Sequence, residues 1–176
     1  MTPTKAAAFS IALVAAAVGA SAEPEIDGAR LAFEPAAIRE IVVDLEAWLD
    51  VHTDLPRSDI PLDRIALIQA GAEVDYEGQP TRLGDTVRGL YDADTATIYL
   101  VRPWFGDTAR HRSTLLHELV HHRQATAQHW YCDAAMEWDA YKTQDAYLAA
   151  HGETGGFNWA WVALVSSCAP RDHHPD

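Results

Sequence analysis

The five residues His117-Glu118-Leu119-Val120-His121 constrain this chain more than any other stretch of its 176 residues. They fit the pattern H-E-x-x-H, and residues at positions i and i+4 of a helix lie on one face, one turn apart. Two imidazoles in that arrangement can bind one zinc ion at ordinary Zn–N distances. The glutamate beside the first histidine can then act as a general base on a zinc-activated water. The stretch therefore predicts a helix that carries a catalytic zinc site.

The flanking residues favour such a helix from about Thr108 to Gln128, because this segment contains neither Gly nor Pro. Asp107 or Thr108 is suited to cap its N-terminus. Apolar neighbours of the two histidines predict that the helix packs into a core while its histidine face opens into a cleft. These neighbours are Leu115, Leu116, Leu119 and Val120. The alternative is a surface helix that carries the two histidines without binding a metal.

A catalytic zinc keeps three protein ligands and one open position, so a third ligand is expected downstream. Glu137 lies in a second segment without Gly or Pro, from about Cys132 to Ala150, which predicts another helix. By helical spacing, Glu137 shares one face with Ala140, Tyr141 and Gln144. Asp133, one turn earlier on that face, is the rival ligand.

The two motifs together, H-E-x-x-H and then E-x-x-A-aromatic, resemble the gluzincin branch of the zincin metallopeptidases between Thr95 and Tyr147. The chain is also similar to small secreted bacterial zincin-like domains. The resemblance implies a Zn²⁺ site with the ligands His117, His121 and Glu137, and Glu118 as general base. Some gluzincins carry a carboxylate where this chain has Tyr141. Orienting the ligands is therefore expected to fall to another acid or to a backbone carbonyl.

Several side chains are candidates to stabilise the oxyanion of a reaction intermediate, as tyrosine or histidine does in related chemistry. They are Tyr131, Tyr141, His111, His122 and His129. Tyr141 is favoured because it lies one turn beyond Glu137 on the same face, although it could instead pack the two helices as a core residue. His122 follows a ligand by one residue and is expected to turn about 100° away from the metal.

A β-branched and apolar segment, Thr95 to Val101, predicts a strand shortly before the metal helix. This order resembles that of zincins, in which an edge strand precedes the metal helix. Such an edge can pair with an extended peptide substrate. An ordinary internal strand is the alternative for this segment.

The remaining patterns predict a helix at 35–51, a strand at 64–70, a loop or hairpin at 71–94 and a C-terminal helix at about 156–167. The expected fold is α+β and helix-dominant, with a zincin-like helix pair that carries the metal site packed on a small sheet. We expect a signal peptide at residues 1–22 and a single domain at 23–176.

The first 22 residues have the features of an export signal, with Lys5, an apolar stretch at 6–18 and the cleavage site Ala20-Ser21-Ala22. We therefore expect a periplasmic or secreted protein that has no membrane segment after cleavage, with an uncleaved anchor as the alternative. Cys132 and Cys168 are the only cysteines. In an oxidising compartment they are expected to form a disulfide, the alternative being a metal-binding pair.

These observations predict an exported zinc metallopeptidase that acts on a peptide or protein substrate. The formal net charge of −13 disfavours nucleic acid as a partner. The alternative is a non-catalytic, zinc-stabilised domain for binding or metal handling, in which a fourth ligand such as Asp133 closes the site. A scaffold that has lost activity is a third reading. The presence of Glu118 favours the enzyme, because a closed zinc site needs no general base.

Overall fold

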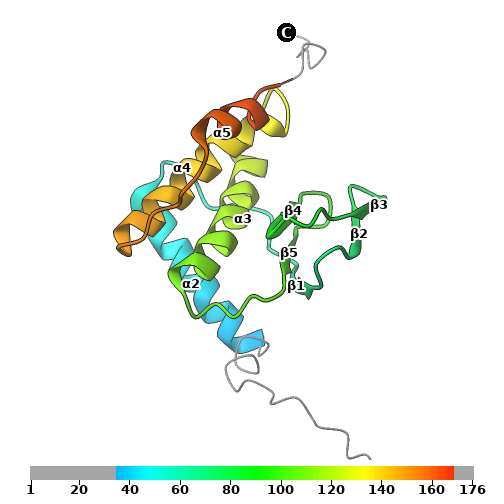
Figure 1. Cartoon of the computed structure of the whole chain (residues 1–176), viewed down its shortest axis with the longest axis horizontal. Coiled ribbons are helices and arrows are strands. Elements are labelled where there is room, and N and C mark those ends of the chain that lie inside the picture. The colour runs from blue at the N-terminus through cyan, green and yellow to red at the C-terminus, as the bar shows by residue number, and fades with distance from the viewer. Residues whose placement is uncertain (1–34, 169–176) are drawn as a thin grey trace, which may run out of the picture.

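The expected α+β, helix-dominant fold is confirmed in a computed structural model that describes residues 35–168 (Figure 1). The predicted signal peptide, residues 1–22, lies outside the described residues. The helices are α2 (Pro35–His52), α3 (Ala109–Ala127), α4 (Ala134–Ala150) and α5 (Trp159–Val165). The strands are β1 (Arg64–Ile68), β2 (Glu73–Tyr76), β3 (Gln79–Arg82), β4 (Gly89–Asp92) and β5 (Thr97–Val101).

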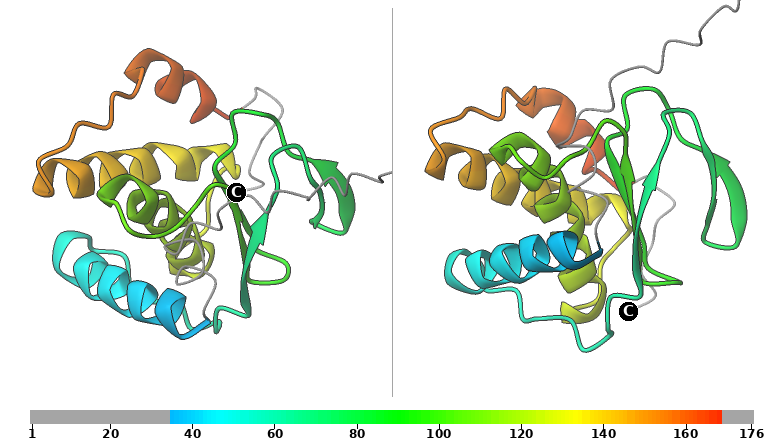
Figure 2. Two further views of the ribbon diagram at one scale, coloured as in Figure 1. Left: turned by 60° about the horizontal axis from the view of Figure 1, so that its bottom comes forward. Right: turned by 90° about the horizontal axis from the view of Figure 1, so that it is seen from below.

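Helix α3 is the centre of the helical layer, between α2 and α4, and α5 lies along α4 on the side away from α2 (Figure 2). Thr108 caps α3, because its side chain accepts a hydrogen bond from the backbone N–H of His111. The apolar residues predicted to bury α3 are fully buried, namely Leu115, Leu116, Leu119 and Val120. Among residues 35–168, no helix combines the length and the apolar character that a membrane crossing requires.

The three-stranded sheet has the order β1-β5-β4, so β5 is an internal strand, which is the second of the two alternatives that the sequence left open for this segment. Strand β5 runs parallel to β1, with Arg64 opposite Thr97, and antiparallel to β4, with Gly89 opposite Leu100. All five residues of β5 are buried, which suits a strand with neighbours on both sides. The edge strand that contacts α3 is therefore β4.

Strand β5 also separates two apolar clusters. Ile98 and Leu100 pack in the main core with the helices. Tyr99 and Val101 alternate with them and pack in a second cluster with Val74 of β2. The β2–β3 hairpin lies on the side of the sheet away from the helices (Figure 2). The sheet thus presents one face to the helical layer, and β4 borders α3.

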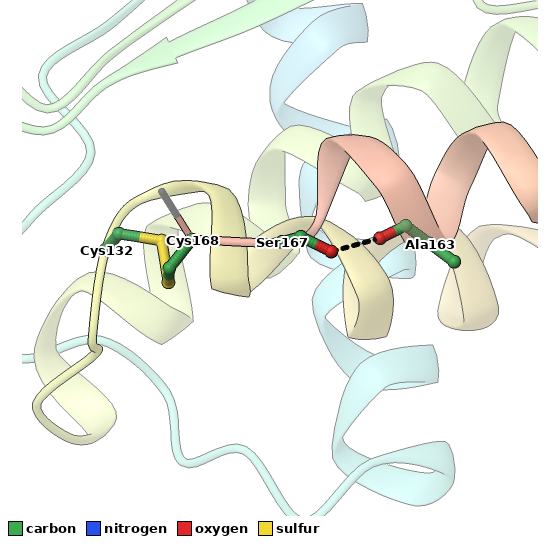
Figure 3. Close-up of a disulfide and its surroundings, with 4 residues drawn as sticks. All are labelled: Cys132, Ala163, Ser167 and Cys168. Carbon is green, nitrogen blue, oxygen red and sulfur yellow. Dashed lines mark hydrogen bonds between the residues drawn. A yellow bond between two sulfur atoms is a disulfide. The ribbon is translucent and has the colours of Figure 1, made fainter. Parts of the chain in front are cut away.

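A disulfide joins Cys132, just before α4, to Cys168, just after α5, with a Cα–Cα distance of 5.8 Å (Figure 3). Near this bond, the hydroxyl of Ser167 donates a hydrogen bond to the carbonyl of Ala163 at 2.7 Å (Figure 3). The bridge spans a sequence separation of 36 residues. A loop of this size contributes about 3–4 kcal/mol in the chain-entropy model. The bridge therefore fixes α5 against the start of α4.

Arg123 joins α3 to α2 through a guanidinium group that is fully buried. Its Nε donates to the carboxylate of Glu46 at 2.9 Å, and its Nη2 donates to Asp50 Oδ1 at 2.7 Å. Nη1 donates to the carbonyl of Leu55 at 3.0 Å. A buried cation is tolerated only when its hydrogen bonds are made, so this cluster depends on all of its members.

We expect Arg123→Ala to lower the free energy of unfolding by about 3 kcal/mol, because it removes a fully buried guanidinium and leaves the largely buried carboxylate of Glu46, 14% exposed, without its cation. The matched control is Arg57→Ala. Arg57 also pairs with Asp50, but its side chain is 60% exposed, and an exposed pair contributes at most about 1 kcal/mol. Urea denaturation of wild type and both variants measures the difference. Equal losses would contradict the structural role of Arg123.

Candidate metal centre

His117 and His121 lie one turn apart on α3 and face Glu137 on α4. The Nε2 atom of His117 is 3.3 Å from Oε2 of Glu137, and Nε2 of His121 is 3.6 Å from Oε1. The ligand atoms of the three residues all lie within 4.8 Å of one another. Within residues 35–168, this is the only group of three or more His, Cys, Asp or Glu side chains that could hold a metal ion.

Two separations in this group, 3.3 Å and 3.6 Å, are close to those of a tetrahedral zinc site, and the ligand atoms of all three residues lie within 4.8 Å of one another. With bond lengths of about 2.0–2.1 Å, two ligand atoms of a tetrahedral site are roughly 3.4 Å apart. Two imidazole nitrogens and one carboxylate oxygen are also a donor set that suits zinc. The three side chains could therefore hold zinc with little movement of either helix.

The predicted ligand face of α4 is the face that meets α3. Ala140 has no exposed surface, and its small side chain lets the two helices pack closely. Gln144 lies two turns beyond Glu137 and reaches α3, where its Nε2 donates to the hydroxyl of Ser113 at 3.2 Å. The spacing of Glu137, Ala140 and Gln144 thus directs them all toward the metal helix.

A glutamine side chain orients each candidate histidine ligand. Nδ1 of His117 is 3.1 Å from Oε1 of Gln144, and Nδ1 of His121 is 3.0 Å from Oε1 of Gln124. Because an amide oxygen can only accept, Nδ1 of each ring carries the proton in these bonds. In a neutral ring Nε2, which faces Glu137, is then the nitrogen without a proton, and this is the form of imidazole that can bind a metal.

The expectation that another acid or a backbone carbonyl orients the histidines is therefore wrong. Neutral amides take this place, and their NH2 groups are used as well. Nε2 of Gln124 donates to the carbonyl of Met136 at 3.0 Å, which fixes the orientation of the amide. Gln144 is fixed in the same way by Ser113. Each amide thus hydrogen-bonds one ligand while its other end is fixed by a second group.

Glu118 lies against the free edge of β4. Its carboxylate accepts a hydrogen bond from the backbone N–H of Tyr91. The carbonyl of Arg88 accepts from Val101 of β5 at 2.9 Å. By the alternation of an antiparallel ladder, the polar backbone groups of Gly89 and Tyr91 point away from β5. The edge of the sheet thus meets the carboxylate that the sequence predicts as general base.

Gly89 allows this close approach. A Cβ atom at Gly89 would lie 2.9 Å from both Cγ and Cδ of Glu118, closer than real Cβ contacts. Any larger residue would therefore push the Glu118 side chain away. Sequence patterns alone do not place β4 at the site, although a glycine inside a strand is a known signal of close backbone approach.

Burial and neighbouring charges shift the pKa values of the four ionisable groups of the site, which are Glu118, His121, His117 and Glu137. Burial raises the pKa of Glu118 to about 7, and the Glu137 carboxylate acts in the same direction. Burial lowers the pKa of His121 to about 4, with His117 adding to the effect. Burial is the largest effect on His117 and Glu137 too and opposes their ionisation, but their hydrogen bond and the neighbouring charges together outweigh it, so the pKa of His117 is raised and that of Glu137 is lowered. A carboxyl with a pKa near neutrality can both accept and donate a proton.

Tyr141 borders the same group. Its ring packs edge-on against His117, with 4.7 Å between the ring centroids. Burial raises the pKa of Tyr141 to about 12, and the charges of Glu137 and Glu118 add to the effect. The hydroxyl therefore stays protonated near neutral pH and can donate a hydrogen bond.

The other candidate residues lie outside this group. His111 pairs with Asp107 at the start of α3, at 2.8 Å. His122 turns away from the candidate ligands, and its Nδ1 is 3.0 Å from the hydroxyl of Tyr91. The exposed candidates are His129, Tyr131 and Asp133, in the connection that leads into α4. The rival ligand Asp133 is therefore not one of the three converging side chains.

The comparisons with known proteins identify a family but no characterised relative. No curated protein and no solved structure matches this chain. Residues 34–176 match the family described as "Domain of unknown function (DUF6647)", and this match includes every residue of the candidate metal centre. The chain therefore belongs to the DUF6647 family.

Proposed function

We propose that this protein is an exported zinc-dependent metallopeptidase, with His117, His121 and Glu137 as zinc ligands. The observation that carries the proposal is the convergence of two Nε2 atoms on one carboxylate, at 3.3 and 3.6 Å. The buried carboxyl group of Glu118 lies on the same helix turn. Zinc bound there would polarise the scissile carbonyl and lower the pKa of the attacking water.

Glu118 is the general base in this proposal. It takes a proton from the attacking water and then passes that proton to the nitrogen of the leaving amine. A pKa of about 7 suits both steps, because the group changes protonation state easily near neutral pH. The backbone N–H of Tyr91 holds the carboxylate by a hydrogen bond, and the lack of a side chain at Gly89 leaves room for it.

Tyr141 is the proposed oxyanion donor. Its ring contacts the ligand His117, and its hydroxyl keeps its proton near neutral pH. A donor beside the site stabilises the charge that develops on the carbonyl oxygen during attack. The half-buried position of Tyr141 strengthens such a hydrogen bond relative to one in bulk water.

The edge of β4 favours an extended peptide as the substrate. The outward N–H of Tyr91 already bonds Glu118, so a peptide that pairs with the other outward backbone groups of this edge would pass directly by the proposed zinc ligands. In this proposal β4 pairs with the substrate, a role that the sequence suggested for the segment that forms β5.

Export is part of the proposal. The predicted signal at residues 1–22 and the bond between Cys132 and Cys168 both fit an oxidising compartment outside the cytoplasm.

The direct test of the proposed activity is an assay of the purified protein on mixed peptide and protein pools. We expect cleavage products that require zinc and disappear with a chelator. Glu118→Gln should lower the rate by about 10²–10⁴-fold, because it removes the base while leaving the ligands. Zinc binding measured on the same samples is the control. No turnover of any peptide by a protein that holds one zinc would contradict the proposal.

The ligand assignment is tested by zinc affinity. Glu137→Ala should weaken zinc binding by more than about 100-fold, beyond the effect of losing a residue that only orients a ligand. Asp133→Ala, just before the same helix, is the matched control and should change affinity by less than about 10-fold. Competition with a zinc-chelating dye measures both variants. The assignment fails if Asp133→Ala loses zinc while Glu137→Ala keeps it.

Gly89→Ala should separate the base from the metal. The new methyl group displaces the flexible Glu118 side chain, so we expect about 10²-fold slower hydrolysis with nearly unchanged zinc affinity. The control is Gly84→Ala, where a Cβ would make only an ordinary contact at 3.9 Å with Val87. Steady-state kinetics and dye competition test this together. Equal hydrolysis by the two variants would argue against the position assigned to Glu118.

A further inference from the structure

A connected series of aromatic rings begins at the candidate metal centre and continues to the surface. Tyr141, which contacts His117, also packs edge-on against Phe157 at 5.1 Å and Trp161 at 6.0 Å between ring centroids. Phe157 contacts Trp159 at 6.0 Å, and Trp159 contacts Trp138 at 5.7 Å. We call this set the aromatic shelf; its members are Trp138, Tyr141, Phe157, Trp159 and Trp161.

The outer part of the aromatic shelf is open to solvent. Trp138, Trp159 and Trp161 are 39%, 37% and 49% exposed. Tryptophan is usually well buried because its large ring has much to gain from leaving water. Trp138 and Trp159 contact each other, and Trp161 is joined to them through Tyr141 and Phe157; exposed aromatic rings gathered in this way are typical of a binding surface.

The segment that carries the shelf is held in place from several sides. Val162 is fully buried and anchors α5 to the rest of the molecule. The disulfide holds the end of α5. The hydrogen bonds of this segment are Arg110 Nη2 to Thr154 O (2.7 Å), Gly155 N to Asp145 Oδ1 (3.1 Å) and Trp161 N to Asn158 Oδ1 (3.2 Å). The exposed rings therefore form a preorganised surface, which loses little freedom when a ligand binds.

We propose that the aromatic shelf binds a large apolar or aromatic side chain of the peptide substrate, one or two residues from the scissile bond. This inference rests on the proposed peptidase function. Two ring-to-ring steps, of 4.7 Å and 6.0 Å, connect His117 to Trp161. An extended peptide advances about 3.3 Å per residue, so a substrate side chain near the scissile bond can reach this ring.

The aromatic shelf adjoins the candidate metal centre, and this limits the kind of ligand that can bind to it. Tyr141 contacts both the ligand His117 and the exposed ring of Trp161, so a molecule on the shelf also lies beside the candidate zinc ligands. A ligand that spans both places must join an apolar group to a group that binds the metal. A peptide with a bulky side chain beside the bond to be cleaved meets both conditions.

Hydroxamates with variable side chains test this inference without requiring turnover. N-acetyl amino-acid hydroxamates place the side chain before the metal-binding group, and succinyl hydroxamates of amino-acid amides place it after. We expect the tryptophan or phenylalanine member of one series to bind the zinc-loaded protein at least about 10-fold more tightly than its glycine and aspartate members. Isothermal titration calorimetry measures each affinity.

Variants of the aromatic shelf show whether Trp161 causes the preference for aromatic hydroxamates. Trp161→Ala should remove most of the aromatic preference, and Trp161→Phe should restore part of it. The control is Leu164→Ala, which alters a side chain that is 71% exposed on the same helix but belongs to none of the ring contacts. Zinc affinity should be unchanged in all three, because neither Trp161 nor Leu164 is one of the candidate ligands.

Two outcomes would overturn the inference. One is the absence of an aromatic preference in both hydroxamate series, and the other is a preference that survives Trp161→Ala. Failure of the proposed peptidase function gives a different pattern, in which zinc binds and aromatic hydroxamates are preferred but no peptide is cleaved. Failure of the metal site itself appears separately, as a lack of zinc binding by the wild-type protein.

Discussion

The close packing of α3 against α4 is the contact on which the candidate metal centre depends. The two histidines of α3 cannot form a three-ligand site alone, and Glu137 reaches them only because Ala140 leaves room between the helices. The disulfide secures the start of α4. Arg123 secures α3 from the opposite side, through α2. The candidate metal centre and the packing of the helices therefore depend on the same α3–α4 interface.

Hydrogen bonds within the α3–α4 interface hold the two helices together and also orient the candidate ligands. Gln144 joins α4 to His117 and to Ser113 on α3, and Gln124 joins His121 to the start of α4. In the described part of the chain, no buried side-chain nitrogen or oxygen lacks a hydrogen-bond partner. Since an unpaired buried amide is costly, the bonds that stabilise the helix pair also set the orientation of each imidazole.

Local sequence patterns were sufficient to predict the helices and to place the two histidines on one face of α3. The spacing of His117 and His121 depends only on helical periodicity, whereas Glu137 meets them through the packing of α4 on α3, and the structure brings these three together. The sheet order was not readable in the same way, because β5 lies at the edge or in the middle according to how distant segments pair. The contact of Gly89 with Glu118 and the bond from Gln144 to His117 likewise depend on tertiary packing, whereas Gln124 lies one turn beyond His121 on the same helix.

The coordination of zinc in the loaded protein tests the central claim most directly. A crystal structure with anomalous diffraction measured at the zinc absorption edge would locate the ion and all of its ligands. We predict one zinc bound by Nε2 of His117, Nε2 of His121 and the carboxylate of Glu137, with one position left open beside Glu118. A fourth protein ligand that closes the site, or a zinc bound elsewhere, would contradict this account.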